Sequence, residues 1–172
     1  MDRPANLVGA LALAVTDRQR QAVEVVAGSE SAAAALSALL HFLDAPSVDL
    51  LRQVLGLTHS GTVRLLDRLE EQGWVTRGAG TDGRTSAVQL TPAGRRTARK
   101  VAAARGRVLD GVLAGLPAAD RAELDRLVGT ALAGMIREPG ATRWTCRLCD
   151  TVACGRDDDR CPVANAAQAR YG

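Results

Sequence analysis

The periodicity of the sequence changes at Gly73, and this change constrains the fold more than any other feature. Before Gly73, apolar residues recur at helical spacing in the stretches 48–56 and 61–73. After it, the short runs 74–78 and 85–91 have an alternating pattern of side chains and flank a loop rich in glycine. Two short runs of this kind around such a loop predict a β-hairpin. The segment is therefore expected to fold as helix, turn, helix and hairpin.

Helices are expected on both sides of this segment. In the stretch 5–27 apolar residues recur at helical spacing, and the stretch 31–44 is apolar nearly all round the expected helix. Thr91 is a good N-cap for a helix over 92–116, and a last long helix is expected over 117–138. Aromatic residues make up only 2% of the chain, so leucine, valine and alanine must build the core. The fold class is expected to be mainly α with a small β-hairpin.

The charge is distributed unevenly along the chain. Between Arg52 and Arg107 the sequence has 11 basic and four acidic residues, a balance of +7, and the remainder is −4. A basic middle with acidic flanks is typical of a polyanion-binding segment, and a solvated face is the simpler alternative. No secretory signal and no apolar stretch approaching ~18 residues is visible. The chain is therefore expected to be cytoplasmic, with no membrane partner.

A short helix, a turn, a second helix and a hairpin form a winged helix-turn-helix, whose second helix enters the major groove of double-stranded DNA. The candidate recognition helix spans about 60–72, with its arginines opposite the apolar face that includes Thr62. The alternative for these arginines is salt bridging to Asp67, Glu70 or Glu71. The predicted DNA contacts here are Thr58, His59, Ser60, Gly61, Thr62, Arg64 and Arg68.

Residues 57–96, "LTHSGTVRLLDRLEEQGWVTRGAGTDGRTSAVQLTPAGRR", resemble the core of the MarR family of transcription regulators. The resemblance extends from about residue 5 to 138. It implies an interlocked helical homodimer whose two lobes read the half-sites of a pseudo-palindromic operator. In this scheme 1–28 and 92–140 form the dimerisation helices and 29–91 forms the DNA-binding domain. The expected function is that of a DNA-binding regulator, and specifically a repressor.

The resemblance also assigns roles within the wing. Asp82 and Arg84 match the family's Asp-x-Arg pair, in which the carboxylate orients the arginine and the arginine enters the minor groove. Val63 stands where the family usually has a small polar residue, so the base preference does not carry over. A crevice for a small-molecule effector, between lobe and dimerisation helices, is a further implication of the family.

No enzyme is expected, because the chain lacks any recognisable catalytic constellation. Its imidazoles are His41, in the apolar helix, and His59, at the helix-turn-helix. His41 is expected to be a partly buried core residue, and His59 is expected to contact DNA.

The tail 141–172 contains every cysteine of the chain, in the spacing C-x2-C-x4-C-x6-C. The ligands would be Cys146, Cys149, Cys154 and Cys161. Four thiolates in a compact segment predict a tetrahedral zinc site. An iron–sulfur cluster is the alternative, since Cys161-Pro162 is similar to the end of ferredoxin motifs, and redox disulfides or free thiols also remain open. The rival function is a metal- or redox-dependent interaction protein that uses the winged helix for protein contacts.

Overall fold

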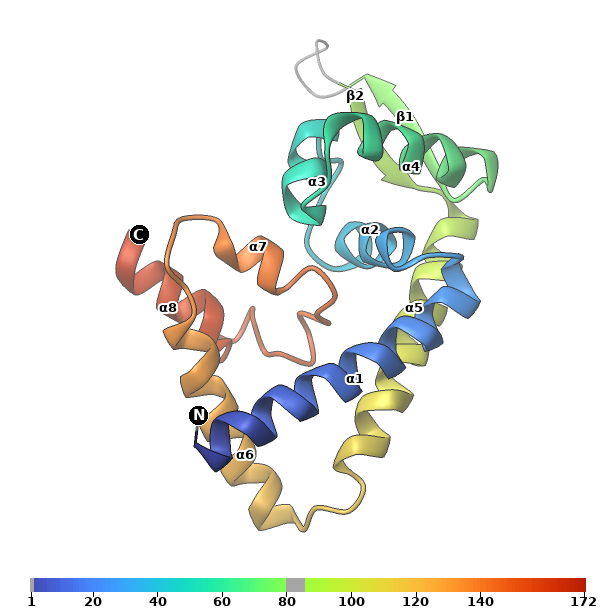
Figure 1. Cartoon of the computed structure of the whole chain (residues 1–172). Helices are drawn as coiled ribbons and strands as arrows, with labels where there is room; N and C mark the ends of the chain where they lie inside the picture. The colour runs from blue at the N-terminus through green and yellow to red at the C-terminus, as the bar shows by residue number, and fades with distance from the viewer. Residues whose placement is uncertain (1, 80–85) are drawn as a thin grey trace.

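The computed structural model describes residues 2–79 and 86–172, and within these ranges the chain forms eight α-helices and one two-stranded antiparallel sheet (Figure 1). The elements in chain order are α1 (Arg3–Ala27), α2 (Glu30–His41), α3 (Val48–Leu55), α4 (His59–Glu71), β1 (Val75–Ala79), β2 (Ser86–Leu90), α5 (Pro92–Leu113), α6 (Ala118–Gly134), α7 (Ala141–Thr145) and α8 (Pro162–Tyr171). The mainly helical fold with a small hairpin is confirmed.

Local sequence signals start and end the helices of the winged lobe. The Ser47 hydroxyl accepts a hydrogen bond from the Leu50 amide at 3.1 Å and caps α3. Thr91 caps α5 in the same way, with Pro92 in the first turn. Gly73 follows α4 with φ +67, a conformation that glycine adopts without strain. The sequence predicted these boundaries because each depends on a side chain next to the boundary itself.

The hairpin packs on the lobe through one face. Val75 pairs with Leu90 in the antiparallel register, and both side chains are buried, as is that of Val88. The Val88 amide also donates to the Pro46 carbonyl at 3.0 Å, which joins β2 to the segment before α3. The hairpin is therefore held at a fixed position relative to α3 and α4.

α2 lies at the centre of the core. Eight consecutive residues, Ala32–Leu39, are buried, which confirms the expectation from its apolar circumference. Around it pack α1, α3, α4, α5 and β2. The largest fully buried side chains of this core are Leu36, Leu51, Leu65, Leu66, Leu69, Val23, Val75, Val88 and Val101.

The C-terminal part departs from the prediction in two ways. The last long helix was expected to continue to residue 138, but α6 ends at Gly134. Ile136 then turns into a second, smaller core together with Cys146, Cys161 and Val163. The tail also contains two helices, α7 and α8, that its sequence pattern did not indicate. Burial of Ile136 in the tail core therefore outweighs the tendency of the helix to continue.

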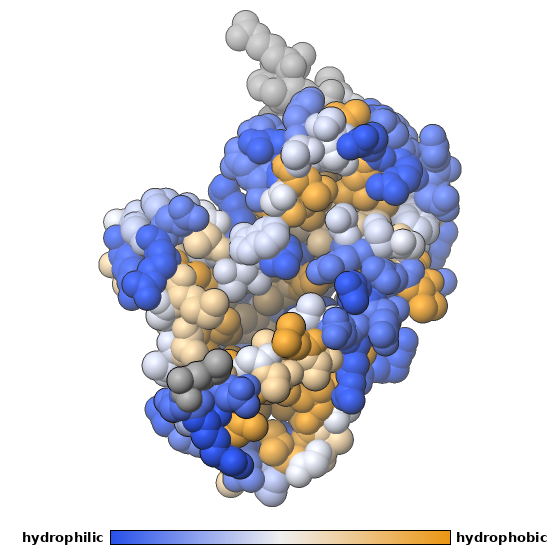
Figure 2. All heavy atoms as spheres, viewed as in Figure 1, coloured by the Kyte–Doolittle hydropathy of each residue, from blue (hydrophilic) through white to orange (hydrophobic). Residues whose placement is uncertain are grey.

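α1 and α6 expose apolar surface. In the described part of the chain, α6 has no buried residue, and Leu127 and Val128 are exposed on it. Leu7 and Leu11 of α1 are each about half exposed. Figure 2 shows apolar residues on the surface over these helices, at the end of the molecule away from the hairpin.

Among the described residues, no single helix is long and apolar enough to cross a membrane, and α1 and α2 meet the length and composition criteria only as a pair bent by 80°.

Candidate DNA-binding face and cysteine cluster

The first turn of α4 faces solvent and carries small polar residues. The Thr58 hydroxyl accepts a hydrogen bond from the Gly61 amide at 3.1 Å and lies 3.4 Å from the Ser60 hydroxyl. A Cβ on Gly61 would lie 3.0 Å from Thr58 Oγ1, so glycine fits this turn closely. The side chains of His59 and Ser60 are exposed. The predicted contacts at the start of the recognition helix thus lie together on an accessible surface.

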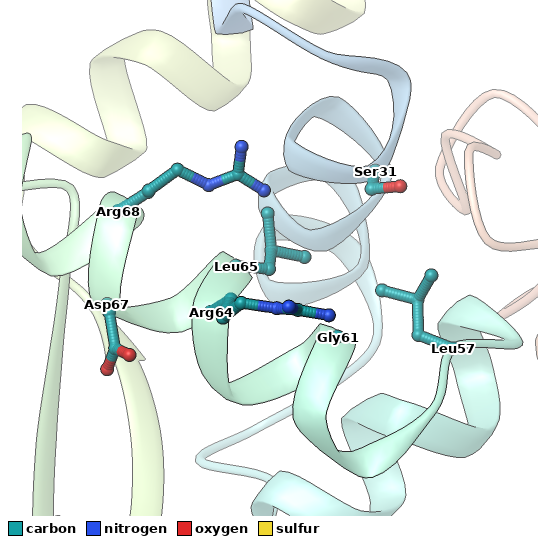
Figure 3. Close-up of a pocket in the computed structure, with 7 residues that line it drawn as sticks. All are labelled: Ser31, Leu57, Gly61, Arg64, Leu65, Asp67 and Arg68. Carbon is teal, nitrogen blue, oxygen red and sulfur yellow. The ribbon is translucent and has the colours of Figure 1, made fainter.

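Arg64 and Arg68 are exposed one and two turns further along α4. They border an open groove of about 590 Å³, with Ser31 of α2 and Leu57 on its other side. Figure 3 shows both arginine side chains at this groove, and the side chain of Asp67, which also lines it, points in another direction. The helix therefore presents two guanidinium groups on the same side as its polar first turn.

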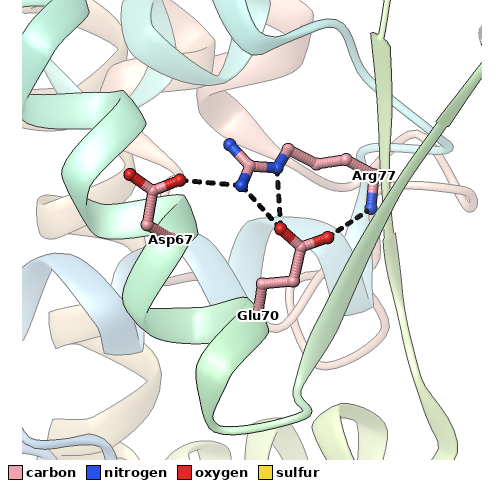
Figure 4. A network of polar contacts seen from close by, with 3 residues as sticks. All are labelled: Asp67, Glu70 and Arg77. Carbon is pink, nitrogen blue, oxygen red and sulfur yellow. Dashed lines mark hydrogen bonds and ion pairs between the residues drawn. The ribbon is translucent and has the colours of Figure 1, made fainter.

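Two of the three acidic residues of α4 bind an arginine of the hairpin. Arg77 of β1 donates from Nη2 to Asp67 at 2.7 Å and to Glu70 at 2.6 Å (Figure 4). Its Nε and its backbone amide donate to Glu70 as well, at 3.0 and 3.2 Å. These hydrogen bonds hold the pKa of the Glu70 carboxyl below its usual value and raise the pKa of Arg77. The network fixes β1 to the middle of α4.

This network decides between the two interpretations of the recognition-helix arginines. Since Asp67 and Glu70 bind Arg77, they are not partners of Arg64 or Arg68, and within residues 2–79 and 86–172 neither arginine forms a salt bridge. Sequence reasoning did not single out Arg77. Its position in a strand that follows α4 directly was the available signal, because a long side chain there can reach back to the helix.

One predicted DNA contact does not fit the structure. Thr62 is fully buried, and its hydroxyl donates to the Thr58 carbonyl at 3.0 Å. It packs with Leu65 and Leu66 on the apolar side of α4, so we do not retain it as a DNA contact. Asp82 and Arg84, the predicted wing residues, lie outside the described residues.

The four cysteines gather around the second core. Cys146 and Cys161 are buried, and Cys149 and Cys154 are half-buried and pack against them. All four are free thiols. Cys161 caps α8, where its sulfur accepts the Ala164 amide at 3.5 Å and Pro162 occupies the first turn. The Cys-Pro pair therefore has a local role in starting a helix.

The thiols shift one another's pKa values. The interaction with Cys146, together with the positive charges of Arg105 and Arg156, lowers the pKa of Cys149 to about 6. The same interaction and burial raise the pKa of Cys146. Burial and a hydrogen bond to Cys161 raise the pKa of Cys154 to about 11. The pKa of Cys149 is thus lowered, whereas those of Cys146 and Cys154 are raised.

Within the described part of the chain, no three histidine, cysteine, aspartate or glutamate side chains stand in an arrangement ready to hold a metal ion. The four cysteine side chains nevertheless pack in one cluster around the second core. A metal would have to displace the thiol protons and draw the sulfurs into its coordination geometry.

Comparison with known proteins agrees with the geometry of the lobe. Residues 29–85 match the sequence model of the MarR family, a shorter stretch than the resemblance over 5–138. No curated protein sequence matches the chain. Similar solved structures include a MarR family protein from Bacillus stearothermophilus, with a TM-score of 0.70 and 23% identity over 80% of this chain and 99% of that one.

Two further structures support the same fold. The transcriptional regulator PA3341 has a TM-score of 0.61 and 26% identity, covering 76% of this chain and 96% of its own. MepR, a transcription regulator of the Staphylococcus aureus multidrug efflux pump MepA, has a TM-score of 0.66 and 15% identity over 76% of this chain and 97% of its own. The chain therefore has the fold of MarR-type transcription regulators, and its residues 29–85 match the MarR family model.

Proposed function

We propose that the chain binds double-stranded DNA through α4 and the hairpin, and that it represses transcription from a pseudo-palindromic operator. The observation that carries this proposal is the pair of exposed arginines on α4, Arg64 and Arg68, together with the binding of Asp67 and Glu70 by Arg77. With them the recognition surface comprises Thr58, His59, Ser60 and Gly61. A mutant of MepR has been crystallised bound to an oligodeoxyribonucleotide, which supports DNA as the ligand of this fold.

In this proposal Asp82 and Arg84 act in the minor groove, as the family resemblance implies. An arginine suits that position because a narrow groove concentrates negative potential. Contacts to the DNA phosphate backbone position the protein on the duplex. Contacts from α4 to base edges carry the sequence preference.

The active form is a homodimer. The exposed apolar residues of α1 and α6 support this, because a helix without buried residues gains little stability from its own chain. A second copy of the same helices would bury Leu7, Leu11, Leu127 and Val128. Two-fold symmetry then gives two equivalent recognition helices, which requires two inverted half-sites.

Selection from a pool of random DNA duplexes tests the proposal. The protein is expected to enrich an inverted repeat, and the logarithm of its binding constant should fall with the logarithm of salt concentration with a slope steeper than about −3. Fluorescence anisotropy at several salt concentrations measures the slope. Affinity that is absent, or that does not depend on salt, would favour the rival function, in which the lobe binds another protein.

The cysteine cluster is proposed to bind one zinc ion through Cys146, Cys149, Cys154 and Cys161. The closeness of the four free thiols supports a metal site, and Arg105 and Arg156 lie near enough to offset the charge of four thiolates. An iron–sulfur cluster is the alternative, but the Cys-Pro pair that suggested it is explained by the start of α8. Redox disulfides or free thiols are the remaining candidates.

Metal content separates these candidates directly. Protein purified under reducing conditions is expected to be colourless and to contain about one zinc ion per chain by elemental analysis. The double variant Cys146→Ser, Cys161→Ser should lose the zinc, whereas Val152→Ala, an exposed position of the same tail, should keep it. A brown solution with visible absorbance would indicate iron–sulfur, and metal-free protein would leave only thiol chemistry.

The proposal also includes a small-molecule effector and a cytoplasmic location. CouR from Rhodococcus jostii has been crystallised with p-coumaroyl-CoA, which supports a small-molecule effector for regulators of this fold. A cytoplasmic location stays a prediction from the sequence, consistent with a protein that acts on the chromosome.

A further inference from the structure

The C-terminal tail, residues 141–172, packs directly against the turn of the helix-turn-helix. The ring of Trp144, near the end of α7, covers Gly56, the residue that ends α3 and opens the turn toward α4. A Cβ on Gly56 would lie 2.6 Å from Trp144 Cζ3, so the indole touches the backbone of the turn. The guanidinium of Arg147 lies 3.8 Å from the ring centroid, and this cation–π contact stabilises the orientation of the indole.

Two further contacts join the same segment of the tail to the lobe. The Thr151 side chain is buried, and its hydroxyl donates to the carbonyl of His41, the last residue of α2, at 3.1 Å. Leu148 packs against the main core. The three contacts to the lobe are thus made by a tryptophan, a threonine and a leucine, and none of them needs a cysteine sulfur.

The opposite side of the tail is fixed to α6. Ile136, two residues after α6 ends, is fully buried in the second core together with Val163 of α8. Leu132 of α6 packs against the same core, and the Arg170 side chain donates to the Ile136 carbonyl. α8 also packs along α6. The second core, which includes Cys146, therefore joins the tail to the end of α6 as one packed unit.

The tail is thereby a second connection between the lobe and α6. The first connection runs through α5 and residues 114–117, which lead into α6. Figure 1 shows the tail between the lobe and α6, below α3 and away from the hairpin. α6 carries the exposed Leu127 and Val128, which the proposed dimer buries. The tail therefore links the helix that pairs the protomers to the lobe that reads DNA.

We propose that the tail is a brace that fixes the orientation of the lobe relative to α6, and that Trp144 positions the turn before α4 for operator binding. This inference rests on the proposed function, because it needs a dimer that reads two half-sites. In such a dimer the orientation of each lobe sets the distance between the two recognition helices, and this distance must match the spacing of the half-sites. A braced lobe therefore accepts only a narrow range of spacings.

Loss of the Trp144 contact should weaken operator binding although no DNA contact is removed. The tail packs on the ends of α2 and α3, and Arg64 and Arg68 of α4 stay exposed. A lobe released from the brace samples several orientations, and the operator must select one of them, which lowers the observed affinity for the two half-sites together. A single half-site can be bound in any orientation of the lobe, so its affinity should not change. Trp144 is 46% exposed, so its replacement should leave the fold intact.

The test compares full-length Trp144→Ala with the wild type on three duplexes under reducing conditions. These are the operator obtained by selection, the same operator with two base pairs inserted between its half-sites, and a single half-site. Fluorescence anisotropy should show that the variant binds the operator about tenfold more weakly than the wild type but binds the half-site within about twofold of it. The insertion should weaken binding by the wild type about 30-fold and binding by Trp144→Ala less than about fivefold.

Two further variants are the controls. Trp144→Phe keeps a ring on Gly56 and should retain most of the preference for the selected spacing. Val152→Ala changes an exposed position of the same tail and should bind all three duplexes like the wild type. Thermal unfolding should give similar midpoints for all forms, so that a difference in affinity does not reflect a loss of folded protein.

Hydrogen exchange provides a readout without DNA. The Leu57 amide donates to the Arg52 carbonyl at 3.2 Å in the turn that Trp144 contacts, and it should exchange faster in Trp144→Ala than in the wild type and Val152→Ala. If no form binds any duplex while Leu57 exchange changes as expected, the proposed function fails and the contact between tail and turn stands. A wild-type spacing preference in Trp144→Ala, an equal loss of affinity for half-site and operator, or unchanged Leu57 exchange would overturn the inference.

Discussion

Replacing both Arg64 and Arg68 by alanine is expected to weaken operator binding about 100-fold, and each single substitution about tenfold. Both side chains are exposed on the side of α4 that carries Ser60 and Gly61, and neither forms a salt bridge among the described residues. Their loss therefore removes contacts to DNA without breaking contacts within the protein. Fluorescence anisotropy on the selected duplex measures the change, and thermal unfolding should give the same midpoint as the wild type.

The salt dependence distinguishes the two kinds of DNA contact. If a substituted arginine binds phosphate, the slope of affinity against salt should become shallower by about one for each arginine replaced, whereas removal of a base contact should relax sequence preference. Arg137→Ala, an exposed arginine beyond the end of α6, is the charge-matched control for the single variants and should bind normally. Wild-type affinity and slope in the double variant would remove α4 from the DNA interface.

Gly94→Ala is expected to lower the free energy of unfolding by about 2–4 kcal/mol. Gly94 lies in the first turn of α5, and a Cβ there would lie 1.8 Å from the carbonyl oxygen of Trp74. The Trp74 carbonyl cannot easily move away from the new methyl group, because it accepts a hydrogen bond from the Thr91 amide at 3.0 Å. The Thr91 hydroxyl also donates to the Gly73 carbonyl at 2.6 Å, so the start of β1 is held against the start of α5.

Urea unfolding of the purified variant measures this decrease in stability. Gly106→Ala is the matched control, because it makes the same change within α5 at a position where nothing lies within 4 Å of the new methyl group. In that open position alanine is expected to stabilise the helix by about 0.5–1 kcal/mol. Equal stability of Gly94→Ala and the wild type would mean that Gly94 of α5 does not touch Trp74, the residue before β1.

The sequence predicted most of the lobe because its boundaries are set locally. Ser47 and Thr91 cap their helices through hydrogen bonds to amides three residues away, and Gly73 ends α4 by its own backbone conformation. The alternating runs after Gly73 indicated the hairpin, since their apolar residues face the core. Helix caps can be predicted from the sequence because the two residues that interact lie within one helical turn of each other.

Long-range interactions were missed for the opposite reason. Arg77 reaches α4 across seven to ten residues, and nothing in the spacing alone distinguishes it from an exposed strand residue. The end of α6 depends on Ile136, which is buried by residues of the tail that follow it by ten positions or more. Thr62 was placed on the apolar face of its helix and also counted as a DNA contact, and its burial agrees with the first of these assignments.

The network of hydrogen bonds from Arg77 to Asp67 and Glu70 makes DNA binding by α4 depend on the folding of the hairpin. Taken alone, α4 carries two arginines against three acidic residues, so the isolated segment is net negative and would be repelled by a polyanion. Only when β1 folds against it does a third guanidinium bind two of those acids. The electrostatic match to DNA is therefore a property of the assembled lobe, and a nascent or partly unfolded chain would not bind nucleic acid through this helix.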